Sequence, residues 1–146
     1  MNYDINIQKE CEKRNINYLS FSLLHKGKPV ISQCNSREWQ AYYNDKYLDL
    51  NTGPPVKKYI EASSHKILIW NLLDLDASTE DYIGLRNEWV KVKTNISFIN
   101  KTATDLSVFG LGSSLNPADF METLRNDLEF FLYLQHSGFL GNYFFS

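Results

Sequence analysis

The stretch 16–34, INYLSFSLLHKGKPVISQC, predicts a β-hairpin. Its first half, 16–24, is rich in Ile, Tyr, Phe and Leu, which favour strands. The turn residues Lys26-Gly27-Lys28-Pro29 follow, and 30–34 return as a second strand. A second hairpin is predicted from 94–100 (TNISFIN) and 106–111 (LSVFGL), on either side of a short polar turn. Much of the chain is therefore expected to form an antiparallel sheet.

One further strand is predicted between the hairpins, at 66–71 (KILIWN), and its apolar run predicts burial on both faces. Apolar residues at helical spacing predict helices at 3–15, 37–46, 56–64, 79–92 and 116–135. Ser36 or Asn35 is expected to cap helix 37–46, and Ser78-x-x-Asp81 resembles a capping box for helix 79–92.

The order of the predicted elements, α-β-β-α-α-β-α-β-β-α, indicates an α/β (α+β) fold with helices on both faces of the sheet. We expect a three-layer α-β-α sandwich around a five-stranded, mainly antiparallel sheet, as in PAS/GAF-like sensor architectures. Small-molecule pockets in such domains lie between the sheet and the helices on one face.

The composition indicates one domain spanning residues 1–146. The chain is 43% hydrophobic and 22% charged, which is typical of a globular core. Fifteen Lys and Arg against seventeen Asp and Glu give a net charge of −2, so direct binding of nucleic acid is not expected. The polar N-terminus and the absence of a long apolar run predict a cytoplasmic protein that does not contact membranes.

No combination of residues in the sequence predicts catalysis. The three histidines, His25, His65 and His136, have no metal-ligand spacing, and the two cysteines, Cys11 and Cys34, are interpreted as small buried side chains. No serine occupies a nucleophile-elbow motif. We therefore expect neither enzyme activity, nor a metal, nor a cofactor.

Aromatic side chains are concentrated on the middle helices and the strand between them. They are Trp39, Tyr42, Tyr43, Tyr47, Tyr59, Trp70, Tyr82 and Trp89. Two interpretations remain open. The rings can be plain core packing, or they can line an apolar pocket to which Tyr O–H and Trp N–H groups supply a few fixed hydrogen-bond donors.

Three short segments resemble the autoinducer-binding domain of LuxR-type quorum-sensing regulators. They are EWQAYY at 38–43, PVKK at 55–58 and WN at 70–71. In that family a W-x-x-x-Y helix precedes D-P-V-[VI], and a Trp ends the next strand. The resemblance runs from about residue 16 to about residue 138.

The resemblance implies a ligand pocket between the sheet and the helices, and often dimerisation. By position, the indole N–H of Trp39 would donate to a lactone carbonyl, while Tyr43 and Trp70 would form pocket walls. The candidate ligand-binding residues are Trp39, Tyr43, Tyr42, Tyr47, Tyr59, Trp70, Trp89 and Asn35.

Three positions depart from the family pattern. Asn35 stands where a Tyr commonly meets the ligand amide carbonyl, and Gly53 or Pro54 replaces the acidic residue that accepts the ligand amide N–H. Gly110 replaces the expected Ser or Thr, and Gly110 and Gly112 are interpreted either as leaving room beside the sheet or as marking a bulge. Asp49 lies a few residues upstream and would substitute for the missing acid only if the loop folds back. These departures favour a ligand other than a standard acyl-homoserine lactone, or weak binding of that lactone.

The last predicted helix is expected to present one core face to the sheet, formed by Phe120, Leu124, Leu128, Phe131 and Leu132. Three apolar residues of this helix would then lie off that face: Phe130, Tyr133 and Leu134. Together with the apolar stretch 141–146 they would form an exposed interface, unless the tail folds back and is buried against the domain.

The leading hypothesis is a stand-alone sensor domain that binds a small, largely apolar signal molecule. The family's helix-turn-helix DNA-binding domain is not expected in these 146 residues, so a role in transcription regulation would pass through another protein. The alternative is an interaction protein without a ligand, which forms a homodimer or pairs with a LuxR-type regulator through its last helix.

Overall fold

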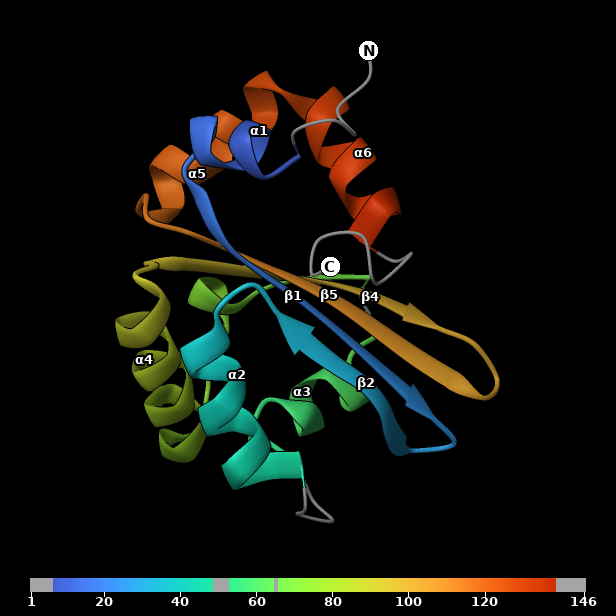
Figure 1. The fold of residues 1–146 in the computed structure, drawn as a ribbon. Coiled ribbons are helices and arrows are strands. Elements are labelled where there is room, and N and C mark those ends of the chain that lie inside the picture. The colour runs from blue at the N-terminus through green and yellow to red at the C-terminus, as the bar shows by residue number, and fades with distance from the viewer. Residues whose placement is uncertain (1–6, 49–52, 65, 139–146) are drawn as a thin grey trace.

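The computed structural model describes residues 7–48, 53–64 and 66–138, and these residues form one sheet with helices on both faces (Figure 1). The strands in the described residues are β1 (Ile16–His25), β2 (Lys28–Cys34), β3 (Ile67–Ile69), β4 (Thr94–Lys101) and β5 (Asp105–Ser113). They lie in the order β2-β1-β5-β4-β3, and each neighbouring pair is antiparallel. Both predicted hairpins and the predicted fold class are confirmed.

Two groups of helices complete the sandwich. One face of the sheet is covered by α1 (Ile7–Lys13), α5 (Pro117–Asn126) and α6 (Leu128–Gly138). The opposite face is covered by α2 (Arg37–Tyr43), α3 (Lys57–Ala62) and α4 (Ala77–Val90) (Figure 1). A π-helical turn, Asn44–Leu48, continues α2, and a 3₁₀ turn, Trp70–Leu72, follows β3.

Because alternate residues of a strand point to opposite faces, β1 contributes to two cores. Leu19 packs into the core beneath α1, α5 and α6, which also contains Phe109, Phe120 and Phe130. Tyr18 packs into the core beneath α2, α3 and α4. The sheet is therefore buried on both faces along β1, β4 and β5.

Two local predictions need correction. The strand at 66–71 is not buried on both faces, because β3 is an edge strand of the described sheet and Ile67 is 48% exposed. Helix α4 is capped by Asp76 and not by Ser78, since Asp76 Oδ1 accepts a 2.9 Å hydrogen bond from the Thr79 N–H. The Ser36 cap of α2 is confirmed, with Oγ accepting from the Trp39 N–H at 3.2 Å.

The predicted helix 116–135 is two helices, and its predicted core face is partly wrong. The break at Asp127 changes the helical phase, so that Phe130 and Leu134 are completely buried. Leu128 and Leu132 are exposed by 53% and 65%. The expected exposed patch therefore does not contain Phe130 or Leu134, and the stretch 141–146 lies outside the described residues.

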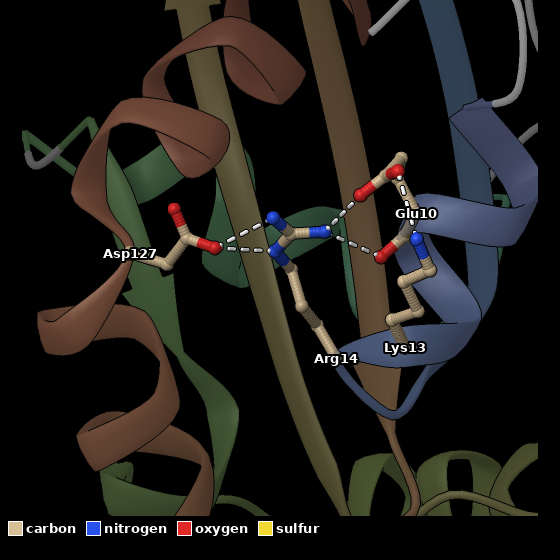
Figure 2. Close-up of polar contacts among 4 residues, drawn as sticks. All are labelled: Glu10, Lys13, Arg14 and Asp127. Carbon is tan, nitrogen blue, oxygen red and sulfur yellow. Dashed lines mark hydrogen bonds and ion pairs between the residues drawn. The ribbon is translucent and has the colours of Figure 1, made fainter.

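Arg14 fixes this break by joining α1 to the α5–α6 junction (Figure 2). Its Nε donates to Asp127 Oδ2 at 2.7 Å, and its Nη1 donates to the backbone oxygen and Oε2 of Glu10, both at 2.8 Å. The guanidinium carbon also lies 3.8 Å from the Phe130 ring centroid. One cation thus satisfies two carboxylates and covers a core aromatic ring.

Leu134→Ala should lower the free energy of unfolding by about 2–5 kcal/mol, because it opens a cavity in a packed core. Leu132→Ala, on the same helix but exposed, is the matched control and should change it by about 0.5 kcal/mol or less. Urea unfolding followed by circular dichroism measures both. Equal effects would contradict the phase of α6 described above.

Glu10→Gln should make stability less sensitive to acid. The hydrogen bond from Arg14 is the main cause of the lowered pKa of the Glu10 carboxyl, whose unperturbed value is 4.5. A lowered folded-state pKa stabilises the fold above pH 4.5, and this contribution is lost as the pH falls through the folded-state value.

Urea unfolding at a series of pH values should therefore show a shallower loss of stability for Glu10→Gln between about pH 5 and pH 3. Glu12→Gln, which changes an exposed carboxylate on the same helix, should keep the wild-type profile. A Glu10→Gln profile parallel to that of the wild type would contradict the role given to this ion pair.

Candidate ligand-binding site

A cavity of about 460 Å³ lies between the sheet and helices α2, α3 and α4. This volume is within the usual range for small-molecule sites. Its floor includes the side chains of β1 that point away from α5 and α6, which are Tyr18, Ser20, Ser22 and Leu24. The helices contribute walls that include Trp39, Tyr43, Val56, Ile60, Tyr82 and Arg86.

The floor changes from polar to apolar along β1. Ser20 lies beside Cys34 and Gly110 in the sheet register, whereas Leu24 lies beside Pro29 and Leu106. Cavity-lining hydroxyl groups therefore concentrate toward the Tyr18 end, and aliphatic side chains toward the Leu24 end. Such a gradient suits an amphipathic molecule that lies along the strand.

Gly110 has a specific steric role on this floor. A Cβ atom at this position would lie 2.5 Å from Ser20 Oγ, which is closer than real contacts allow. The space that a side chain at position 110 would need is therefore occupied by the hydroxyl of Ser20. The sequence interpretation that Gly110 leaves room beside the sheet agrees with this contact.

Trp39 lies at the centre of an aromatic cluster and lines the cavity while being only 2% exposed. Its ring stacks on Tyr42 at a centroid distance of 5.3 Å and meets Tyr82 edge-on at 5.7 Å. Trp89 packs edge-on against the same ring at 5.9 Å. The indole N–H of Trp39 makes no hydrogen bond to any described residue, so this donor is fixed in orientation and remains unused.

Trp70 also lines the cavity, but its indole N–H is already bonded. It donates to Ser97 Oγ on β4 at 2.8 Å, and the bond is buried. Tyr59 packs edge-on against Trp70 at 6.2 Å, and its hydroxyl accepts from the Asp76 N–H at 2.9 Å. Trp70 is thus a wall held in place from two directions.

The structure brings four of the eight candidate residues to the cavity lining: Trp39, Tyr43, Tyr47 and Trp70. Tyr42, Tyr59 and Trp89 lie outside the lining and pack against its rings, and Trp89 is 40% exposed. Asn35 joins β1 to the segment after β2, since its Oδ1 accepts from the Leu19 N–H at 3.0 Å. Whether any of the eight binds a ligand remains a prediction.

Sequence reasoning missed most of the polar residues of the lining, which include Tyr18, Ser20, Ser22, Ser97 and Arg86. A signal for the first three was present. In YLSFS at 18–22, polar residues alternate with apolar ones on a strand that the fold class covers on both faces. Arg86 gave no comparable signal, because an arginine on an amphipathic helix normally faces solvent.

The ionisable groups near the polar end are held in their neutral forms. Burial is the main cause of the raised pKa values of Tyr18, Tyr43 and Tyr82, and also of the Cys34 thiol. At neutral pH these groups therefore offer hydroxyl and thiol groups rather than negative charge.

Acidic side chains do not line this cavity within the described residues, whereas Gly53 and Pro54 do. Asp49, the acid considered from the sequence as a substitute, lies outside the described residues, as does His65. Across residues 7–48, 53–64 and 66–138, no cluster of three His, Cys, Asp or Glu side chains could hold a metal ion.

None of the helices in this part of the chain has the length and apolar character needed to cross a membrane.

The architecture matches solved structures of LuxR-family proteins. One is CepR2 of Burkholderia cenocepacia, an N-acylhomoserine lactone-dependent LuxR family transcription factor, with a TM-score of 0.61 and 17% identity over 92% of this chain and 81% of that one. The chain has the LuxR-type ligand-binding fold. The expected resemblance is confirmed at the level of the fold.

Two further structures share the LuxR-type fold. The ligand-binding domain of VqsR from Pseudomonas aeruginosa matches with a TM-score of 0.52 and 12% identity, over 93% of this chain and 85% of that one. SdiA in complex with octanoyl-rac-glycerol matches with a TM-score of 0.53 and 17% identity, over 90% of this chain and 58% of that one. No protein-family model and no curated protein matches the sequence.

The Trp70–Ser97 hydrogen bond should be measurable by a double-mutant cycle. Trp70→Phe keeps an aromatic wall but removes the donor, and Ser97→Ala removes the acceptor. Either change leaves a buried partner unpaired and should cost about 1–3 kcal/mol of unfolding free energy. The double variant should cost less than the sum of the two, with a coupling energy of about 0.5–1.5 kcal/mol. If the loss of unfolding free energy in the double variant equals the sum of the two single losses, the Trp70–Ser97 hydrogen bond does not stabilise the fold.

Proposed function

We propose that this chain is a sensor domain that binds a small, largely apolar signal molecule in the cavity beside Trp39. The observation that carries the proposal is the cavity of about 460 Å³ with an unused indole N–H fixed at its wall. An acceptor group on a ligand in the cavity would give this donor the partner that it lacks among the described residues. We propose that Trp39, Tyr43, Tyr47 and Trp70 contact the ligand directly.

The remaining candidate residues would act on the ligand indirectly. Tyr42 and Trp89 pack on the Trp39 ring, and Tyr59 packs on Trp70, so all three hold the rings that face the cavity. Asn35 bonds to the backbone and would set the position of the β1–β2 edge.

The named ligands of the structural neighbours support an acyl chain with a polar head. CepR2 depends on an N-acylhomoserine lactone, and SdiA was solved with octanoyl-rac-glycerol. Here the polar-to-apolar floor suits the same general shape. With Gly53 and Pro54 at the place of the acid that would accept a lactone's amide N–H, we propose that a standard acyl-homoserine lactone binds weakly.

Binding would act through folding and assembly. A ligand that binds only the folded domain stabilises it as its concentration exceeds the dissociation constant. Because the cavity lies within the core that the sheet shares with α2, α3 and α4, an occupant would add contacts between these layers. We propose that the filled domain regulates transcription in the cytoplasm, as in quorum sensing, by pairing with itself or with a LuxR-type regulator.

The alternative of an interaction protein without a ligand receives less support. Its pocket would have to be filled by side chains, whereas the cavity is open. The last helix was expected to form its interface, but Phe130 and Leu134 are buried in the core and cannot contact a partner. Leu128 and Leu132 are exposed on α6.

Ser22→Phe should block ligand binding by filling the middle of the cavity. Thermal shift of the wild-type chain is measured with 1-decanoylglycerol, N-decanoyl homoserine lactone and decanoate. A ligand at about one hundred times its dissociation constant adds about 2.7 kcal/mol, which raises Tm by roughly 5–10 °C. At least one compound should shift the wild type, and none should shift Ser22→Phe.

Val30→Phe is the matched control, because Val30 is a strand residue that is 60% exposed and lies outside the cavity lining. It should respond to the ligand as the wild type does. A wild type that responds to none of the three compounds, or a Ser22→Phe variant that responds equally, would overturn the proposed function.

A further inference from the structure

Arg86 is placed at the polar end of the cavity by α4. Its guanidinium carbon lies 5.5 Å from the ring centroids of both Tyr18 and Tyr82, so it sits between two aromatic walls. Its Nη2 donates to Asn95 Oδ1 at 3.2 Å, and Asn95 is itself bonded to Asn87 and Asn71. These contacts hold the guanidinium beside the sheet rather than in solvent.

The hydrogen-bonding capacity of Arg86 is largely unused. Its Nε is buried and has no partner in the structure as described, although a guanidinium carries five N–H donors. Arg86 forms no ion pair with any acidic side chain among the described residues, unlike Arg14, which contacts two. Arg86 as a whole is half-buried. Partial burial of a cation without a counter-ion carries a desolvation cost, and two aromatic rings compensate only part of it.

The other groups around the cavity cannot serve as the counter-ion. Tyr18, Tyr43, Tyr82 and the Cys34 thiol are held neutral by burial. The described lining also includes two further cations, Lys28 and Lys57, but no carboxylate. Lys57 already lies 3.5 Å from a carboxylate oxygen of Glu61, outside the cavity lining. Lys28 forms no ion pair with a described residue either, but it is an exposed residue of the edge strand β2. Arg86 is therefore the half-buried lining cation that lacks an anion among the described residues.

We propose that the ligand is an acyl-chain carboxylate, with its anionic head on Arg86 and its chain directed toward Leu24 and Leu106. This inference rests on the proposed function and specifies its ligand class. The planar guanidinium matches a carboxylate through paired hydrogen bonds. The distance along β1 from Tyr18 to Leu24 is about 20 Å at the rise of a strand, which accommodates an extended acyl chain.

The test compares three compounds that share one chain and differ in the head group. They are decanoate, methyl decanoate and N-decanoyl homoserine lactone, titrated into the intact chain by calorimetry at pH 7.5. Because a hydrogen-bonded charge pair adds to the affinity that the shared chain provides, decanoate should bind at least about tenfold more tightly than either neutral compound.

Arg86→Gln should remove this preference by weakening decanoate about tenfold while changing methyl decanoate by about twofold or less. Arg86→Lys keeps the charge and should keep part of the preference. Arg37→Gln, an exposed arginine on α2 outside the lining, is the matched control and should bind all three compounds as the wild type does. Circular dichroism and Tm establish that each variant is folded.

The outcomes separate this inference from the proposed function. Equal affinity of the wild type for decanoate and its methyl ester would overturn the carboxylate assignment while leaving the sensor proposal in place, and it requires no variant. A preference that survives Arg86→Gln but disappears in Lys57→Gln would place the head at the other end of the cavity and would also overturn the inference. Absence of binding by all three compounds would contradict the proposed function itself.

Discussion

The structure depends on one constraint, which is that β1 lies inside a sheet covered by helices on both faces. Every side chain of its middle residues must therefore be buried in one of two cores. On one face this condition is met by apolar packing of Leu19 and Phe21. On the other face the same strand presents Tyr18, Ser20 and Ser22, whose hydroxyl groups cannot pack as hydrocarbon. A cavity with polar groups at one end is the result.

The two tryptophans that line this cavity are held in place by neighbouring side chains. Trp70 is fixed by Ser97 and Tyr59, and Trp39 by Tyr42, Tyr82 and Trp89. On the opposite face, Arg14 holds the junction of α5 and α6 against α1. The protein thus has one densely packed layer that supports the sheet and one layer with space. A ligand in that space would convert the second layer into a complete core, which links occupancy to stability.

The fold could be predicted because its signals are local. The hairpins are indicated by strand-forming residues on either side of turn residues. The LuxR-type arrangement is indicated by three short segments, which contain Trp39, Pro55-Val56 and Trp70. The break at Asp127 was not predicted, because the Arg14 side chain that contacts Asp127 comes from a segment distant in sequence. Trp39 and Trp70 could be assigned to the cavity because each belongs to a short segment that resembles the family. Arg86 belongs to no such segment and was missed. Its position depends on Asn95 and Tyr18, which approach it only in the folded chain.

The most direct test of the account observes the indole N–H signals of the three tryptophans by NMR, with Trp39→Phe providing the assignment. Trp39 faces the cavity with a free donor, Trp70 faces it with a bonded one, and Trp89 lies outside the lining. Titration with decanoate should move the Trp39 signal most and the Trp89 signal least. A titration that saturates while the Trp39 signal remains in place would contradict the assignment of this cavity as the binding site.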